Sequence, residues 1–526
     1  AIRHQEPEAV RVPDSGDSDV YLSARQMRAV FHDDRVLVRI TGKDRRGRLE
    51  GDVVEVLERN TRHVVGRFYH ESGINIVVPD NKRIVHDIFV PEAETGGAAH
   101  GQIVSVEIIE QPGKRQRPVG RVIEVLGEHM APGMEIDIAI RSHDLPQEWP
   151  DPVVQEITGL GDEVSKRARR GRTDLRSLPL VTIDGADARD FDDAVFCERK
   201  AGGWRLLVAI ADVSHYVKPD KALDQEALNR GNSVYFPERV IPMLPEVLSN
   251  GLCSINPDVD RLCLVCEMLI NDEGKISRSG FIEGVMRSHA RLTYQQVASI
   301  LVEKEKKLRK QYSLLVPHLE ELHRLYKVLR KAREERGAID FETTETRIVF
   351  GVDRKIERIV PLERNDAHKL IEECMIAANV AAARFLIRHK MPTLFRVHAR
   401  PEADKLEGVQ EFLRELGLAL RGGARPGAKD YATLLESVRG RPDEHLINTV
   451  LLRSMPRAEY HPENIGHFGL AHEKYVHFTS PIRRYPDLLV HRAIRHILAG
   501  GKATDFGYSH AGMQSLGDHC SMTERR

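Results

Sequence analysis

The sequence predicts a multidomain protein in which two small β-barrels of the oligonucleotide-binding (OB) type precede a large α/β domain. Three observations support this prediction. The 526 residues are too many for one ordinary hydrophobic core. The first 130 or so residues contain short β-rich runs separated by Gly, Asp and Asn turns, and mixed α and β patterns begin near residue 179. We therefore place the domains at 1–62, 63–130 and 179–526, with 131–178 as a linker and basic lead-in.

The β-rich part of the chain contains a repeat. Strands are predicted at 34–40, 52–58, 63–69, 74–80, 87–92, 101–110 and 119–128. The segment at 10–23 resembles the segment at 74–92, and RGRLEGDVVEVLE resembles RQRPVGRVIEVLGE. A repeat of about 65–70 residues favours two successive barrels of the oligonucleotide-binding kind over a generic pair of β-domains, which is the alternative.

The rest of the chain alternates strand and helix patterns. LPLVTID predicts a strand, and AVFCERK and WRLLVAIAD predict a hairpin around an AGG turn. Helices are predicted within 294–336, at 365–390 and over most of 401–526. The basic stretch KRARRGR (166–172) is either a solvated face or a guide for phosphates.

Composition limits the class of protein. The hydrophobic fraction of 41% and the charged fraction of 30% are typical of soluble globular domains. Because the formal net charge is −1, a nucleic-acid site would have to be a local basic channel. No apolar run approaches the roughly 18 residues of a membrane span, and no signal peptide opens the chain. Since the chain begins at Ala1 without methionine and ends at TERR, we expect a piece of a longer protein.

The cysteines predict no disulfide framework. Six are scattered along the chain, and only Cys263 and Cys266 form a CxxC. That pair lies inside the apolar run RLCLVCEMLI, which favours buried strand thiols over a zinc or redox site. Few unpaired cysteines in a long chain indicate a reducing cytoplasm.

The strongest chemical feature is the acidic segment TIDGADARDFDDAVF, residues 182–196. Asp184 ends a predicted strand, and Asp190, Asp192 and Asp193 follow on a tight loop. Carboxylates packed this closely raise one another's pKa, and a hard divalent cation such as Mg²⁺ or Mn²⁺ relieves the repulsion. The alternative is a polar surface loop with calcium-like or no metal affinity, although the spacing does not match a calcium-binding helix–loop–helix.

Long motifs around this segment resemble the ribonuclease II and ribonuclease R family, and within it the ribonuclease R branch. They include TIDGADARDFDDAV, IADVSHYV, RGNSVYFPERVIPMLPEVLSNGLCSINP, ARLTY, RGAIDFE, LIEECMIAANV, FRVHARPE and HFGLAHEKYVHFTSPIRRYPDLLVHR. The resemblance implies paired cold-shock-type domains followed by a ribonuclease II-type catalytic domain. Ribonuclease R-like chains usually also carry an N-terminal helical domain and a C-terminal RNA-binding barrel, and we expect neither within these 526 residues.

The resemblance also implies a metal centre. Asp184, Asp190 and Asp193 are expected to hold Mg²⁺, with Mn²⁺ as a substitute. Asp192 is expected to be the fourth carboxylate of this metal site and the one most critical for turnover. Arg483 matches the arginine on the scissile phosphate, where a guanidinium fork suits the charge of the transition state. Spacing alone leaves Arg484 as an alternative.

Further residues are implied to bind RNA. Tyr235 and Phe341 correspond to aromatic residues that clamp terminal bases, and the alternative for each is a core aromatic. Glu373 shares a helical stripe with Leu370 and Ala377, so it should face the apolar side, where a carboxylate needs a partner. The resemblance implies that Glu373 and Tyr294 contact the ribose 2′-hydroxyl. Glu524 is also expected to contact the RNA.

We expect a monomeric, cytoplasmic, processive exoribonuclease that hydrolyses single-stranded RNA, and RNA with a 3′ overhang, in the 3′-to-5′ direction to nucleoside 5′-monophosphates. Two rivals remain: an RNA-binding or chaperone protein with a silent catalytic domain, and a metal phosphatase for small phosphoesters. The histidines of the motifs (His215, His398, His467 and His491) are expected to be mostly structural, although histidine acid–base catalysis is an alternative mechanism.

Overall fold

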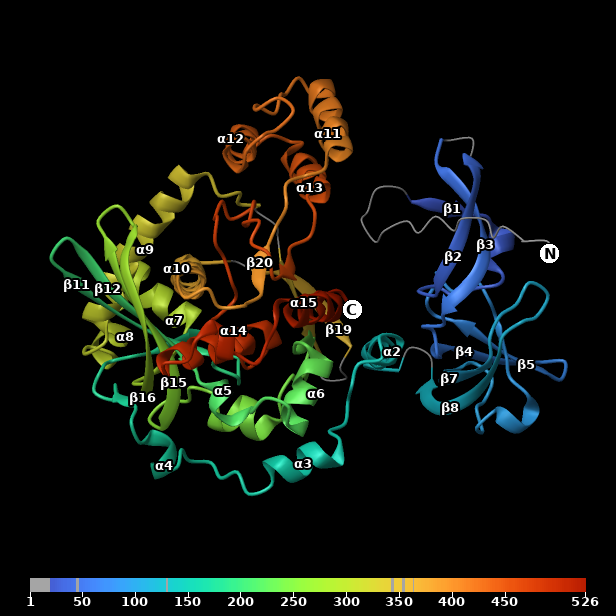
Figure 1. Cartoon of the computed structure of the whole chain (residues 1–526), viewed down its shortest axis with the longest axis horizontal. Coiled ribbons are helices and arrows are strands. Elements are labelled where there is room, and N and C mark those ends of the chain that lie inside the picture. Colours follow the sequence, from blue (N-terminus) through green and yellow to red (C-terminus); the bar gives the residue numbers. More distant parts are fainter. Residues whose placement is uncertain (1–18, 44–46, 129–130, 342–344, 352–354, 363) are drawn as a thin grey trace, which may run out of the picture. The chain divides into compact units, whose positions relative to one another are not determined.

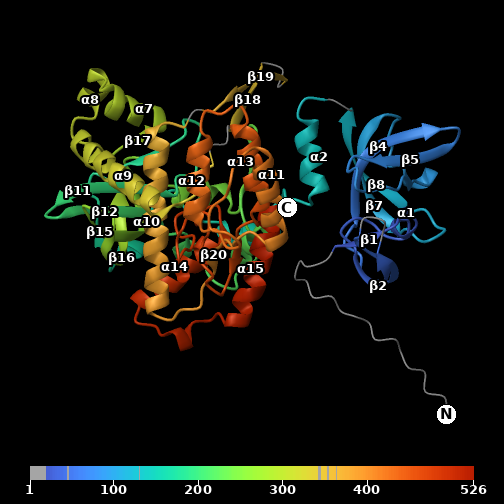
Figure 2. The ribbon, with the colours of Figure 1, turned by 90° about the horizontal axis from the view of Figure 1, so that it is seen from above.

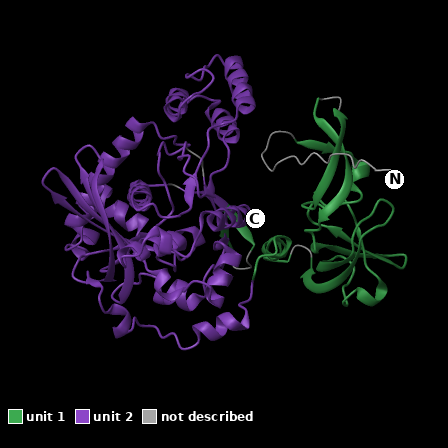
Figure 3. Cartoon of the chain, in the orientation of Figure 1, with its two compact units in different colours: residues 1–146, 348–358 green, residues 147–347, 359–526 purple. Residues whose placement is uncertain are grey.

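A computed structural model describes residues 19–43, 47–128, 131–341, 345–351, 355–362 and 364–526. The chain divides into two compact units (Figure 3). Unit 1 comprises Ala1–Pro146 and Ile348–Arg358, and unit 2 comprises Gln147–Arg347 and Ile359–Arg526.

Unit 1 begins with a small three-stranded sheet. Its strands are β1 (Val20–Leu22), β2 (Arg35–Lys43) and β3 (Leu49–Glu58), in the order β1-β3-β2, and the short helix α1 (Ala24–Met27) follows β1. β2 and β3 pair antiparallel, in agreement with the strands predicted at 34–40 and 52–58. Residues 1–18, which the prediction includes in the first barrel, lie outside the described residues.

A closed five-stranded barrel follows in unit 1. It contains β4 (His63–Glu71), β5 (Ile74–Pro79), β6 (Ile88–Phe89), β7 (Gln102–Glu110) and β8 (Val119–Glu128), in the order β4-β5-β6-β8-β7. Alternating apolar residues fill its core, among them Phe68, Val77 and Val104. All five predicted strands are present, although 87–92 forms only the two residues of β6. The 3₁₀ turn η1 (Glu92–Glu94) and helix α2 (Met134–Ser142) also belong to unit 1.

Unit 2 is built on a five-stranded sheet. Its strands are β9 (Thr173–Asp174), β11 (Asp193–Lys200), β12 (Gly203–Ala211), β15 (Asp260–Asn271) and β16 (Ile276–Arg287), in the order β11-β12-β15-β16-β9. The predicted hairpin is present as the antiparallel pair β11–β12. Cys263 and Cys266 are fully buried on β15, and all six cysteines are free and buried, as the thiol interpretation predicted.

The sheet is buried on both faces, because alternate residues of β12 enter two different cores. Leu206 and Val208 pack in the core that includes α9 (Val316–Arg336) and α10 (Asp366–Arg388). Leu207 and Ala209 pack in the core that includes α5 (Val213–Tyr216) and α6 (Ala222–Arg230). Helix α14 (Tyr485–Leu498) supplies residues to both cores, and Figures 1 and 2 show these helices around the sheet.

Four two-stranded sheets complete the strands of the described residues. They are β10 (Thr182–Asp184) with β17 (Arg291–Thr293), β13 (Val234–Phe236) with β14 (Arg239–Ile241), β18 (Thr346–Phe350) with β19 (Ile356–Pro361), and β20 (Phe395–Val397) with β21 (Glu459–His461). The strand predicted from LPLVTID is therefore shorter than the run and ends at Asp184.

The helical character predicted for 294–336, 365–390 and 401–526 is confirmed, with α9, α10 and α14 among the helices of these ranges. The remaining helices lie both before and within these ranges. They are α3 (Asp151–Ile157), α4 (Lys166–Arg169), η2 (Val247–Leu252), α7 (Tyr294–Ala298), η3 (Ser299–Glu303), α8 (Lys306–Gln311), α11 (Ala403–Glu415), α12 (Ala428–Val438), α13 (Glu444–Ser454), η4 (Ala503–Asp505) and α15 (His510–Arg525). Across the described ranges, no helix is long and apolar enough to cross a membrane.

Candidate active site

The four aspartates lie around one loop of unit 2. Asp184 is the last residue of β10, the loop runs from residue 185 to 192, and Asp193 is the first residue of β11. We call residues 185–192 the acidic loop. β10 is fixed by parallel pairing with β17, and β11 by antiparallel pairing with β12, so the two strand ends hold Asp184 and Asp193 near each other.

Asp192 is held by a segment that lies 290 residues further along the chain. Asp192 is 5% exposed, and its Oδ1 accepts a hydrogen bond of 2.9 Å from the backbone amide of Ile482. The Nε of Arg483 lies 3.7 Å from its Oδ2. Burial raises the pKa of Asp192 well above the usual range, and the charge of Arg483 and the Ile482 amide only partly oppose this effect.

Asp193 and Asp184 share this unfavourable environment. Burial raises the pKa of Asp193 to about 7, with a further contribution from the charge of Asp184. Burial also raises the pKa of Asp184, although the backbone amide of Gly185 donates to its Oδ1 at 2.7 Å. The Oδ2 of Asp193 is buried without a hydrogen-bond partner among the described residues.

These carboxylates fit a divalent cation by their chemistry. Burial, with a smaller contribution from mutual repulsion, raises the pKa values of three acids beside one partly exposed arginine, and a hard cation with oxygen ligands would relieve both effects. The orphaned oxygen of Asp193 could serve as a ligand atom. In the described part of the chain, however, no three His, Cys, Asp or Glu side chains are arranged to hold a metal ion as they stand. Binding would therefore require the carboxylates to turn toward a common point.

Two tyrosines border the carboxylates. The ring of Tyr235, on β13, is half exposed, and its hydroxyl donates to Oδ2 of Asp190 at 2.8 Å. Tyr294 begins α7 and stacks on His368, with ring centroids 3.9 Å apart and an interplanar angle of 19°. Burial raises the pKa of Tyr294, and the negative charge of Asp184 adds to the shift.

Glu373 faces the apolar side of α10, as its helical stripe predicted, and is 5% exposed. Its partner is Arg333 of α9, whose Nη1 donates to Oε1 of Glu373 at 3.0 Å and to Oε1 of Glu372 at 3.0 Å. Burial raises the pKa of Glu373, and the charge of Arg333 opposes this shift. The buried carboxylate of Glu373 therefore has the partner that its burial requires, which is Arg333.

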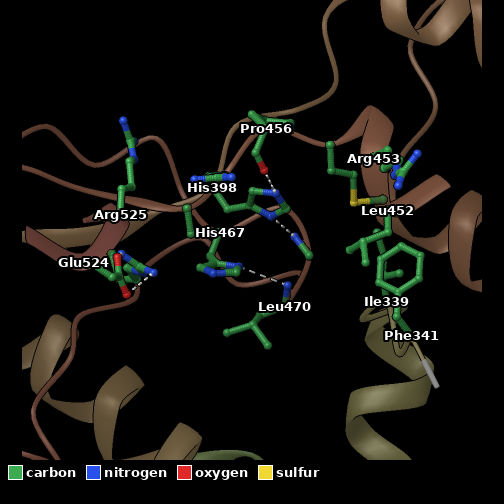
Figure 4. Close-up of a pocket in the computed structure, with 15 residues that line it drawn as sticks. Ile339, Phe341, His398, Leu452, Arg453, Pro456, His467, Leu470, Glu524 and Arg525 are labelled. Carbon is green, nitrogen blue, oxygen red and sulfur yellow. Dashed lines mark hydrogen bonds and ion pairs between the residues drawn. The ribbon is translucent and has the colours of Figure 1, made fainter. Parts of the chain in front are cut away.

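Phe341 and Glu524 line a separate cavity of about 780 Å³ (Figure 4). Glu524 accepts two hydrogen bonds from Arg396, of 2.6 and 2.9 Å. In Figure 4, Phe341 lies near Leu452 on one side of the cavity, and Glu524 lies on the other side. Of the two aromatic residues predicted to clamp bases, Tyr235 therefore contacts the acidic loop, whereas Phe341 lines this cavity.

The structure distinguishes the neighbouring arginines. Arg483 is 44% exposed, and its Nη2 donates to Ser480 Oγ at 3.1 Å. Arg484 is 19% exposed and forms an ion pair of 2.8 Å with Asp487 of α14. Within the basic stretch 166–172, Arg172 is only 6% exposed and pairs with Asp212, so part of that stretch is interior.

The histidines of the motifs bond mainly to backbone groups. In His398, Nε2 contacts the Pro456 carbonyl at 2.9 Å, and Nδ1 accepts from the Gly469 amide at 2.9 Å. His491 is fully buried, with Nε2 at 2.8 Å from the Phe478 carbonyl. Both ring nitrogens of His398 are occupied, which supports a structural role.

Several residues at the site were not singled out from the sequence. Ser254 and Arg291 bond to the acidic loop, the Ile482 amide bonds to Asp192, and Arg333 bonds to Glu373. Ser254 and Arg291 lie inside SNGLCSINP and ARLTY, but nothing in the local pattern indicates which loop they contact.

Three known protein families match successive parts of the chain. The RNB domain matches residues 172–500, the cold shock domain residues 76–150, and the ribonuclease B OB domain residues 11–56. The predicted fold class of two OB-type barrels and a ribonuclease II-type catalytic domain is thereby confirmed.

Curated relatives carry the name ribonuclease R. The chain is 56% identical over 520 residues to the Vibrio cholerae protein, covering 97% of this chain and 63% of that protein. It is 56% identical over 517 residues to the Escherichia coli protein, covering 97% of this chain and 64% of that one. It is 43% identical to the protein of Buchnera aphidicola from Acyrthosiphon pisum, covering 97% of this chain and 71% of that protein. The chain thus spans somewhat less than two thirds of its first relatives.

Solved structures give the same fold. Mycoplasma genitalium RNase R in complex with ribose-methylated single-stranded RNA aligns with a TM-score of 0.88 at 27% identity, covering 98% of this chain and 82% of that one. Yeast Ssd1, a pseudonuclease, aligns with a TM-score of 0.72 at 17% identity, covering 94% of this chain and 62% of that one, and shows the fold alone.

Proposed function

The chain belongs to the ribonuclease R family of RNB-domain proteins, and from this premise we propose that it is a processive, hydrolytic 3′-to-5′ exoribonuclease that releases nucleoside 5′-monophosphates. One observation carries the proposal most directly. The buried carboxylate of Asp192 lies against both the Ile482 amide and the guanidinium of Arg483, so two distant segments meet where an acid cluster needs a cation. A carboxyl group buried at this cost, with a strongly raised pKa, indicates function more than stability.

Each residue has a defined task in this proposal. Asp184, Asp190 and Asp193 would hold Mg²⁺, for which Mn²⁺ can substitute, and a cation bound there would supply activation of water and charge neutralisation. Arg483 is partly exposed and oriented by Ser480, so its guanidinium is available to a phosphate oxygen. Asp192 is fixed by a backbone amide and therefore acts from a constant position in turnover.

The substrate is single-stranded RNA or RNA with a 3′ overhang. The half-exposed ring of Tyr235 offers a stacking surface beside Asp190, and Phe341 offers another in its cavity with Glu524. Tyr294 and Glu373 are the proposed readers of the ribose 2′-hydroxyl. Complexes of Mycoplasma genitalium RNase R with single-stranded and with double-stranded RNA support an RNA substrate.

The setting of the enzyme is also proposed. Six free, buried cysteines suit a reducing cytoplasm. A monomer is the simplest working state for a chain whose four acidic residues all come from one loop and its flanking strands.

The test compares two labelled RNAs in the presence of Mg²⁺. With a 5′ label, a 3′-to-5′ exonuclease produces a ladder that shortens with time, and with a 3′ label it releases labelled mononucleotide at once. Asp192→Asn serves as the control, because the side-chain volume and the Oδ1 acceptor for Ile482 are kept. Internal cleavage, or release from the 5′ end, would refute the proposal.

The rival function is that of an RNA-binding protein with a silent catalytic domain, and the same experiment distinguishes it. Ssd1 shares the fold and is a pseudonuclease. All four aspartates are present in this chain, which favours catalysis. RNA binding without any shortened product across a range of Mg²⁺ and Mn²⁺ concentrations would favour the silent domain. Hydrolysis of a small phosphomonoester, with intact RNA, would favour a metal phosphatase.

A further inference from the structure

The acidic loop is held from both sides by side chains outside the carboxylate cluster. Its aspartates repel one another, so the loop backbone needs an external constraint to keep Asp190 and Asp192 in place. Two polar side chains from distant segments, Ser254 and Arg291, supply that constraint through the loop's own peptide groups.

Ser254 bonds to the backbone on both sides of Asp190. Its Oγ donates to the carbonyl of Arg189 at 3.0 Å and accepts from the amide of Phe191 at 2.9 Å. Ser254 is fully buried, and Arg261 fixes its carbonyl through a hydrogen bond of 2.8 Å. Because one hydroxyl spans both neighbours of Asp190, a change at Ser254 would alter the direction of that carboxylate.

Arg291 bonds to the first half of the same loop. Its Nη2 donates to the carbonyls of Ala186 and Ala188, both at 2.9 Å, and its guanidinium lies 4.7 Å from the centre of the Phe191 ring. Phe191, which lies between Asp190 and Asp192 in the sequence, is itself buried. Arg291 begins β17, which pairs with β10, so the loop is tied to the strand that presents Asp184.

We propose that Ser254 and Arg291 are positioning residues that fix the acidic loop in the shape required to bind a divalent cation. This inference rests on the proposed metal-dependent function, and it adds the residues that shape the site without touching substrate. Residues that orient metal ligands typically change metal affinity or activity by about 10- to 100-fold when they are replaced.

The test uses Ser254→Ala with a matched control. Ser249→Ala removes an equally buried serine hydroxyl, 3% exposed, that bonds to the Pro245 carbonyl rather than to the acidic loop. Mn²⁺ binding to the RNA-free protein is measured by calorimetry, the Mg²⁺ dependence of cleavage by product release, and RNA affinity by gel shift in chelator. Ser254→Thr, which keeps the hydroxyl, is the rescue variant.

We expect Ser254→Ala to weaken Mn²⁺ binding and to raise the Mg²⁺ requirement for cleavage by about 10- to 100-fold. RNA affinity in chelator should stay within a few-fold of wild type, excess Mg²⁺ should restore turnover, and Ser249→Ala should behave as wild type. Equal Mn²⁺ affinity in Ser254→Ala and Ser249→Ala would overturn the inference. If wild type itself neither binds Mn²⁺ nor cleaves RNA, the proposed function fails instead.

A second variant decides the outcome if Ser254→Ala does not fold. Arg291→Lys keeps the charge but loses the planar guanidinium that donates to both carbonyls and lies over the Phe191 ring. Its control is Arg287→Lys, since Arg287, the last residue of β16, pairs with Asp260 of β15 and not with the acidic loop. A fall in Mn²⁺ affinity confined to Arg291→Lys supports the inference, and equal affinity in the two lysine variants overturns it.

Discussion

Tyr235 combines two interactions in one side chain, and substitution can separate them. Its ring is half exposed, and its hydroxyl donates to Asp190 at 2.8 Å. Alanine removes both the stacking surface and the hydrogen bond, whereas phenylalanine removes only the hydrogen bond. We expect Tyr235→Ala to stop digestion early and leave longer limit oligonucleotides, and Tyr235→Phe to keep a nearly normal endpoint.

The magnitudes follow from the two interactions. Loss of one base stack costs about 1–3 kcal/mol, which corresponds to about a 5- to 140-fold weaker hold on a short oligonucleotide. Loss of the partly exposed hydrogen bond from Tyr235 to Asp190 costs about 0.5–1.5 kcal/mol, which corresponds to at most about a 2- to 12-fold weaker hold on the same oligonucleotide. A long RNA offsets either loss through other contacts, so the difference should appear only when the substrate becomes short.

The assay follows 5′-labelled RNA to its final products for wild type, both Tyr235 variants and Val240→Ala. Val240 lies opposite Tyr235 in the β13–β14 pair and is 46% exposed, so it reports on truncation of the same hairpin without loss of an aromatic ring. An unchanged endpoint in Tyr235→Ala, or an equal shift in Val240→Ala, would show that Tyr235 does not anchor the terminal nucleotides.

Three further predictions concern the carboxylates. Asp192→Asn should reduce turnover at least tenfold (by about 1.4 kcal/mol or more) and leave RNA affinity within a few-fold, and residual turnover above a tenth of wild type in product-release assays would contradict its role. A DNA strand should bind but resist cleavage, and single deoxynucleotides in RNA should cause pauses that Glu373→Ala shortens. If Glu373→Ala discriminates as sharply as wild type, the 2′-hydroxyl is read elsewhere. The third prediction applies in the presence of chelator. The pKa of Asp193 is about 7 in the folded protein and about 3.9 in the unfolded chain, so the folded state binds the proton more tightly. The free energy of unfolding should therefore fall as pH rises from about 4 to 7. In urea unfolding, the free energy of unfolding of Asp193→Asn should depend less steeply on pH than that of wild type. An unchanged slope would show that Asp193 does not have this raised pKa.

Local pattern was sufficient for much of this protein. The alternation of apolar residues predicted the barrel strands and the β11–β12 hairpin, and the helical stripe predicted that Glu373 is buried. Such features depend on periods of two or about 3.6 residues, which the sequence displays directly. The acidic segment could also be found directly, because its four aspartates are close in sequence.

Only the tertiary structure supplied the partners of these residues. The amide of Ile482 reaches Asp192 across 290 residues, and Arg333 on a different helix reaches Glu373. Spacing left Arg483 and Arg484 equivalent, whereas the fold directs Arg483 toward Asp192 and Arg484 toward Asp487. Contacts of this kind depend on how strands and helices pack over long separations, and neither local periodicity nor residue type encodes which distant group lies within hydrogen-bonding distance.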